Sequence, residues 1–287
     1  MKRTLLLMFI MVVVMVSTVF GEGWNTSADV TLSINQNAYS DNWGGDEKGT
    51  INWVFNANFL AEKQLSSKMN NTNTLKLALG QTHSQFEDDN GDKAWAKPDK
   101  TTDLIDLESI LRFTLGTFVD PFAGFRLESQ FLDQSKVDST KILNPMVLTE
   151  SFGVARVWVK KENTEFTSRL GGAFKEYLNS HEGIDNTTDG GIEFVTEYRS
   201  PLANNKINFS SKLNVYKAMY YSEADAADAE GDDSWKAPRM NWENIFTTSI
   251  TKLINVNLYV QMLYDERTID EMQFKQTLAL GLTYKLL

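Results

Sequence analysis

The chain has 287 residues, 42% of them hydrophobic and 11% aromatic, and it carries 28 basic against 38 acidic residues and no cysteine. The lack of cysteine excludes disulfides and thiolate metal sites, and the acidic balance argues against nucleic acid as a partner. No dinucleotide-binding glycine pattern, phosphate-binding loop or zinc-binding helix motif is present, so we expect no cofactor.

The N-terminus has the features of a secretory signal peptide. Lys2 and Arg3 precede an apolar run from Leu5 to Val16, and small residues lead up to Gly21. The run is short for a transmembrane helix, and a retained membrane anchor is the alternative. We expect residues 1–21 to be removed and residues 22–287 to form a single domain. Without Lys2 and Arg3 the remainder has 26 basic and 38 acidic residues, a formal charge of −12.

From Trp24 onward, polar and apolar residues alternate with a period of two. Val30, Leu32 and Ile34, for example, alternate with Thr31 and Ser33. A strand places two such sets on opposite faces, and an amphipathic helix does not. The pattern predicts strands at residues 24–39, 49–62, 74–85, 102–115, 121–132, 148–160, 164–177, 189–199, 206–221, 240–252, 254–264 and 272–286.

The lengths of the strands and of their connections predict the architecture. Strands of ten or more residues suit a tilted membrane crossing, whereas strands of soluble proteins usually have about five or six residues. Long polar loops alternate with tight turns such as 116–120 and 161–163, as in outer-membrane barrels. We predict an all-β fold, a transmembrane antiparallel up-and-down β-barrel of about 12 strands. Residues 63–73 are expected to be an unusually long turn at the periplasmic end.

Aromatic residues gather near the expected strand ends, which is typical of interfacial girdles. A soluble β-protein with these aromatics in its core is the alternative reading. The residues are Trp24, Tyr198 and Tyr284 at the expected inner rim, and Trp53, Tyr220, Tyr221 and Trp242 at the outer rim.

The final segment, Gln276 to Leu287, resembles the C-terminal insertion signal of outer-membrane barrels, with Gly281, Tyr284 and Leu286 at the glycine and hydrophobic positions. This resemblance implies recognition by the barrel-insertion machinery, and outer-membrane lipid and lipopolysaccharide as surroundings.

Three further stretches resemble a family of bacterial outer-membrane barrels known only as a domain of unknown function. The resemblance implies the fold and a location in the outer membrane of a Gram-negative bacterium, and nothing about activity. The stretches are Ser33–Gln36 through Asn42–Gly45, Lys100–Asp103, and Leu143–Pro145 through Thr149–Ser151.

Charged residues fall on the face that is expected to line the lumen. Where Leu111, Phe113, Phe125, Val157 and Leu170 point outward, the neighbouring arginines point inward and need carboxylates nearby, because like charges on adjacent strands repel. We expect a network in the periplasmic half that either plugs the lumen or selects solutes by charge. Its members are Arg112, Arg126, Arg156, Arg169, Glu108, Glu128, Glu193 and Glu197.

Other candidate sites have simpler explanations. His83 and Ser84 are adjacent, and adjacent strand residues point to opposite faces, so they do not form a nucleophile and base. Residues 87–92 and 223–233 are acidic and offer carboxylates for calcium, but neither fits the EF-hand spacing, and a solvated acidic rim is the simpler explanation. Trp43, Trp95 and Trp235 lie in predicted loops, where an indole either stacks on a ligand or packs within the loop.

The polar lumen favours a narrow diffusion channel or a small-solute uptake pore of unknown solute. The alternative is a closed barrel that binds ligands or acts as a scaffold through its outer loops. An outer-membrane hydrolase is a third class, which the sequence does not favour because it contains no triad or oxyanion motif, and we expect no enzyme.

Overall fold

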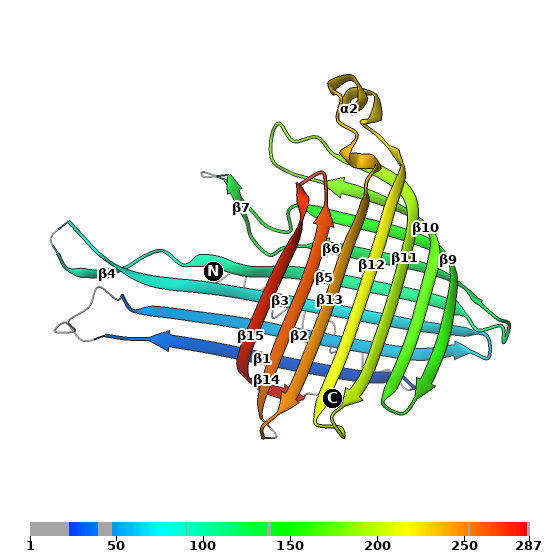
Figure 1. The fold of residues 1–287 in the computed structure, drawn as a ribbon, viewed down its shortest axis with the longest axis horizontal. Coiled ribbons are helices and arrows are strands. Elements are labelled where there is room, and N and C mark those ends of the chain that lie inside the picture. Colours follow the sequence, from blue (N-terminus) through cyan, green and yellow to red (C-terminus); the bar gives the residue numbers. More distant parts are fainter. Residues whose placement is uncertain (1–22, 40–47, 90, 137–138, 252, 286–287) are drawn as a thin grey trace.

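The structure is a computed structural model that describes residues 23–39, 48–89, 91–136, 139–251 and 253–285. Residues 283–285 are described by their backbone alone. Twelve strands form one closed antiparallel barrel (Figure 1). They are β1 (Asn25–Asn37), β2 (Thr50–Ser66), β3 (Met69–Glu87), β5 (Asp99–Phe113), β6 (Asp120–Ser129), β9 (Met146–Lys161), β10 (Thr164–Leu178), β11 (Thr187–Leu202), β12 (Ile207–Tyr221), β13 (Pro238–Ser249), β14 (Ile254–Asp265) and β15 (Ile269–Lys285).

Each barrel strand pairs with the next barrel strand along the chain, and β15 pairs with β1 to close the ring. All twelve predicted strands are present, so the up-and-down barrel is confirmed. The remaining elements lie in the connections at one end. They are the short strands β4 (Lys93–Trp95), β7 (Asp133–Lys136) and β8 (Ser139–Lys141), the helix α2 (Ala224–Glu230) and the 3-10 turn η1 (Ser234–Lys236).

The alternation along each strand separates a polar lumen from an apolar outer surface. On β2, Leu60 and Glu62 line the lumen cavity, so Trp53 and Phe55, of odd number, face outward. On β12, Ser210 and Lys212 line the cavity and Leu213 faces outward. Outward side chains of β9 such as Phe152, which is 71% exposed, have few protein neighbours, whereas outward side chains of β2 and β3 such as Phe59 and Leu77 are buried. This surface suits a bilayer.

The expected long turn at residues 63–73 is wrong. β2 continues to Ser66 and β3 begins at Met69, which leaves a tight hairpin turn. The outward positions of β3 here carry asparagines instead of apolar residues, and this conceals the strand in the sequence. Asn71 Nδ2 donates to the Ile110 carbonyl at 3.2 Å, and Asn73 Nδ2 donates to Asn71 Oδ1 at 2.6 Å. Side-chain hydrogen bonds therefore replace apolar contacts at the start of β3.

The connection from β6 to β9 docks against the outer side of β5. The Asp103 carboxylate accepts hydrogen bonds from the backbone N–H groups of Phe131 at 2.6 Å and Leu132 at 2.9 Å. Phe131 is 1% exposed and belongs to an apolar cluster with Leu77 and Ile105. Two of the stretches that resemble the uncharacterised family, 100–103 and 143–151, contribute to this docking and to the polar cluster described next.

A buried polar cluster fixes the same connection to the loop after β10. The Asp133 carboxylate lies 3.0 Å from His181 Nε2 and accepts a hydrogen bond from Asn144 Nδ2 at 2.6 Å. Burial opposes ionisation, but the N–H of Ser135 and the amide of Asn144 lower the pKa of Asp133 to about 2. The loop end of the barrel is therefore held in a defined conformation.

No helix among the described residues is both long enough and apolar enough to cross a membrane.

Candidate functional site: a charged network across the lumen

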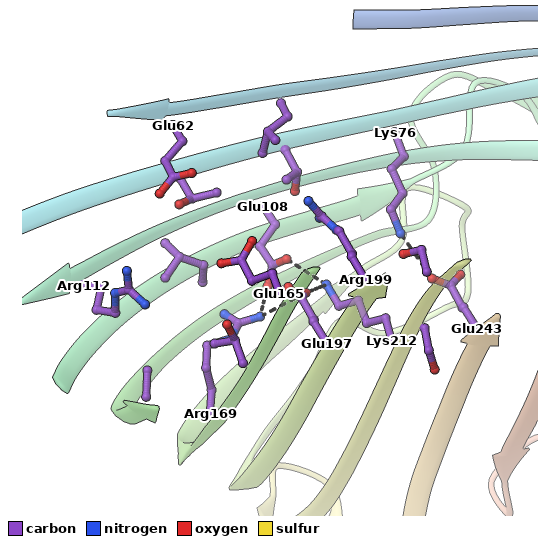
Figure 2. A pocket seen from close by; sticks show the side chains of 18 of the residues that line it. Glu62, Lys76, Glu108, Arg112, Glu165, Arg169, Glu197, Arg199, Lys212 and Glu243 are labelled. Atoms are coloured by element: carbon purple, nitrogen blue, oxygen red, sulfur yellow. Dashed lines mark hydrogen bonds and ion pairs between the residues drawn. The ribbon is translucent and has the colours of Figure 1, made fainter. Parts of the chain in front are cut away.

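The lumen contains a cavity of about 180 Å³ in the half of the barrel nearer the short turns (Figure 2). Charges of both signs line it in equal number, which favours ion pairs over a uniformly charged wall. The charged lining residues are Glu62, Glu108, Glu165, Glu197 and Glu243, and Lys76, Arg112, Arg169, Arg199 and Lys212.

Glu108 is the centre of this network. Its carboxylate accepts hydrogen bonds from Arg169 at 2.7 Å and from Lys212 at 2.7 Å, and Lys212 also lies 3.2 Å from Glu197. Glu108 stands on β5 and Lys212 on β12, with β6, β9, β10 and β11 between them on the shorter way around the ring. The ion pair therefore joins nearly opposite walls of the barrel.

A second ion pair also crosses the lumen. Lys76 Nζ on β3 lies 3.2 Å from Glu243 Oε2 on β13, and the Tyr259 hydroxyl donates to Glu243 Oε1 at 2.9 Å. On the shorter way around the ring, β2, β1, β15 and β14 separate β3 from β13. Two side-chain bridges thus span the barrel, so charged groups cross the lumen at this level.

The other predicted lumen residues form pairs along the wall. Arg126 binds Asp106 through two hydrogen bonds of 2.8 and 3.0 Å and also lies 3.0 Å from Glu128. Glu193 accepts a hydrogen bond from Asn214 at 2.9 Å and lies 3.9 Å from Lys175. Arg112 lines the cavity, with its Nε 4.0 Å from the Asp120 carboxylate.

The placement of Arg156 in the lumen is wrong. Ala155 lines the cavity, so the next residue on β9 faces outward, and the Arg156 guanidinium lies 4.2 Å from the Phe118 ring. The error arose from a β-bulge. Val159 pairs with Phe166, but Val157 pairs with Thr167, so Trp158 is an extra residue and Val157 faces inward. Counting by twos across this bulge gives the wrong face.

The sequence analysis missed the cations and carboxylates that cross the lumen. Lys212, Lys76, Glu243 and Asp106 all lie on the polar parity of their strands, which was the available signal. The predicted network contained only arginines and glutamates on neighbouring strands. Partners on opposite walls are set by the closure of the ring, which sequence spacing does not show.

The mouth at the long-loop end is also narrowed from within. Trp235 of η1 packs against the buried residues Tyr216, Ala218 and Ala173. Beside it, the fully buried Asp189 carboxylate binds Arg239 at 2.6 Å and the Tyr216 hydroxyl at 2.6 Å. A loop therefore folds inward, which the sequence left open. Trp235 packs within the protein, Trp95 on β4 is 47% exposed, and Trp43 lies outside the described residues.

On the outer surface, a row of aromatic rings follows the end with the short turns. Successive ring centroids are 4.7 to 6.4 Å apart. Such a row is typical of a membrane–water interface. The row is Phe118, Trp158, Phe166, Tyr198, Phe209 and Phe246.

The remaining candidates do not assemble a second site. His83 pairs with Ile51 and Ser84 with Thr50 in the β2–β3 register, so the two side chains point to opposite faces. Glu87 pairs with Lys48 at 2.8 Å, and Asp228 with Lys236 at 2.7 Å. Within the described part of the chain, no group of three or more His, Cys, Asp or Glu side chains is placed to hold a metal ion.

A closed ring of twelve tilted strands with a charged lumen and an apolar, aromatic-edged outer surface defines a transmembrane β-barrel. Residues 34–134 match a family described as "Protein of unknown function (DUF3078)". This match agrees with the resemblance found in the sequence, over about a third of the chain. No curated protein matches the chain.

Several solved barrels are similar at low identity. One is the translocator domain of the autotransporter NalP from Neisseria meningitidis, with 11% identity, 99% of this chain and 96% of that chain covered, and a TM-score of 0.35. Another is an outer-membrane channel from Pseudomonas putida F1, with 12% identity, 93% and 96% coverage, and a TM-score of 0.40. A third is the β-domain of a Bordetella autotransporter, with 10% identity, 92% and 99% coverage, and a TM-score of 0.35.

Proposed function

We propose that this protein is an outer-membrane channel for small hydrophilic solutes, held closed by ion pairs that cross its lumen. The observation that carries the proposal is the pair of bridges Glu108–Lys212 and Lys76–Glu243 between opposite walls. Charged groups keep a lumen hydrated when they separate, whereas an apolar filling leaves no polar path.

The location is supported by the outer surface. Outward side chains on β9, β10 and β15 are large and apolar, and the aromatic row lies at one level on six neighbouring segments of the barrel. This is the surface that a barrel presents to hydrocarbon. Removal of residues 1–21 during export, and insertion by the barrel-assembly machinery, are parts of the same proposal.

The equal number of acidic and basic groups around the cavity bears on the solute. A wall of one sign selects ions of the opposite sign, and a balanced wall discriminates weakly by net charge. We therefore expect small zwitterionic or neutral polar solutes, and no enzymatic activity is part of the proposal.

Single-channel conductance of the purified barrel in planar bilayers tests the proposal. The native protein should show small, rare openings, and the double variant Glu108→Gln with Lys212→Gln should open severalfold more often. Arg169→Ala should shift selectivity toward cations, because it removes a lumen cation. Arg156→Ala is the matched control, since this arginine lies outside the lumen and its loss should leave conductance unchanged.

The competing proposal is a closed barrel that acts through its loops, and the ordered cluster around Asp133 and His181 favours it. If none of the variants conducts while all of them retain the gel mobility of a folded barrel, the channel is contradicted and this alternative gains support.

A further inference from the structure

The seam that closes the barrel is short among the described residues. Within this part of the chain, β1 pairs with β15 from Asp29 to Ser33, opposite Lys285 to Gly281. β1 pairs with β2 along its whole length, and β15 pairs with β14 as far as Ile269. Among the described residues, the stretch of β15 from Ile269 to Leu280 thus has a neighbouring strand on one side only.

The two edges beyond the seam match each other. Continuing the register would place Ile34 opposite Leu280 and Asn35 opposite Ala279. Ile34 and Leu280 are both outward and about three-fifths exposed, at 62% and 61%. Asn35 follows the lumen parity of Ser33, and Ala279 follows that of Gly281. In the continued register, outward apolar residues lie opposite outward apolar residues, and lumen-facing residues lie opposite lumen-facing residues. The two strand edges can therefore pair as well as separate.

Gly281 marks the point where the strands part. A Cβ at this position would lie 2.7 Å from both Ser33 Oγ and Thr31 Cγ2, so any other residue would require these two side chains to move. Directly beyond this pair, the described residues of β1 and β15 are no longer in register. We call the unpaired stretch between the two strands, which lies toward the long-loop end of the barrel, the gap.

The gap connects two different environments. On its lumen side lie Asn35 and Thr277, the latter in register with Tyr259, which binds Glu243. On its outer side lie Ile34, Leu278 and Leu280. Backbone N–H and C=O groups left unpaired at membrane depth are costly, so an empty seam should close in a bilayer. A molecule that keeps it open must offer polar groups to the lumen side and an apolar chain to the outside.

We propose that the β1–β15 seam is a lateral gate that admits the head group of a phospholipid-like amphiphile from the bilayer into the lumen. The head group replaces the missing strand partner, and the acyl chains remain against Leu278 and Leu280. This role is separate from solute passage along the barrel axis, and its tests do not depend on conductance.

Closure of the gate is tested by cross-linking, for which the cysteine-free chain is well suited. Asn35→Cys with Ala279→Cys should form a disulfide on mild oxidation in membranes, because directly paired strand residues lie within disulfide reach. Thr247→Cys with Asn257→Cys, a registered pair of the closed β13–β14 seam, is the control. If only the control pair cross-links, the seam does not close and the gate is overturned.

Entry of a head group is tested in vesicles containing phosphatidylethanolamine with a maleimide on its head group. Thr277→Cys, at the gap, should be labelled at least tenfold faster than Thr167→Cys, which lines the lumen on β10. A water-soluble maleimide on the folded protein checks that both thiols are reactive. Equal labelling by the lipid, or labelling of Thr277→Cys by the soluble reagent alone, would overturn the proposal.

Discussion

The Glu108 carboxylate on β5 and the Lys212 ammonium on β12 lie 2.7 Å apart, although each side chain starts from a different side of the barrel. Arg169 shares the same carboxylate at 2.7 Å. Glu108 is thus the acid nearest to both cations, and Glu197 is the second, at 3.2 Å from Lys212 and 3.8 Å from Arg169.

Glu108→Gln should therefore destabilise the barrel more than Lys212→Met. The first change removes the nearest carboxylate from two buried cations, leaves them only the more distant Glu197 within this cluster, and should cost about 3–5 kcal/mol. The second leaves Glu108 paired with Arg169 and should cost less. The temperature at which the folded band disappears from a heat-modifiable gel measures the difference. Equal transition temperatures would show that Glu108 is not the central acid.

The cost of an arginine on the outer face should depend on how deep in the bilayer it lies. Leu213→Arg, near the middle of β12 and outward, should cost about 2–4 kcal/mol. Phe209→Arg lies in the aromatic row, where the penalty falls to about 0–1 kcal/mol. Asn214→Arg is the matched lumen control, because its native side chain binds Glu193. The fraction of each variant that is recovered as folded barrel in membranes measures these costs. A lower folded fraction for Asn214→Arg than for Leu213→Arg would contradict the assigned faces.

Acid should release the connection between β6 and β9. An unfolded aspartate has a pKa near 3.9, and the pKa of Asp133 in the fold is about 2. A lowered pKa means that the stabilisation is complete above about pH 4 and is lost as the pH falls toward 2. Pepsin should cut near Phe131 increasingly over this range. Asp133→Asn should be cut throughout with little pH dependence, and an unchanged native profile in that variant would exclude Asp133 as the cause.

The acidic loops should be accessible on intact cells. Residues 87–92 follow β3 and residues 223–233 follow β12, and both connections lie at the end that carries the long loops. Protease added outside should cut both segments without opening the periplasm. The turn at 203–206, at the opposite end, is the internal control and should be cut only after the outer membrane is permeabilised.

The sequence by itself determined the strands, because period-two alternation has one structural solution over segments this long. It also determined which face of β2, β5 and β12 meets lipid, since apolar parity is unbroken there. It did not reveal the part of β3 that precedes Thr74. Asparagines occupy the outward positions there and are held by side-chain hydrogen bonds, so the apolar alternation on which the prediction depended is absent.

Only the tertiary structure decided which charges meet. Arg169 and Glu108 were expected in one network, but Lys212 reaches Glu108 only because the ring curves β12 round to face β5. Arg156 was lost from the network because one extra residue at Trp158 reverses the parity, and a bulge depends on strand pairing that is invisible in one strand alone. The short β1–β15 seam has the same origin. Alternation along one strand determines which side chains face outward and which face the lumen. How many residues of β1 and β15 pair depends on how the ring closes, and no single strand shows this.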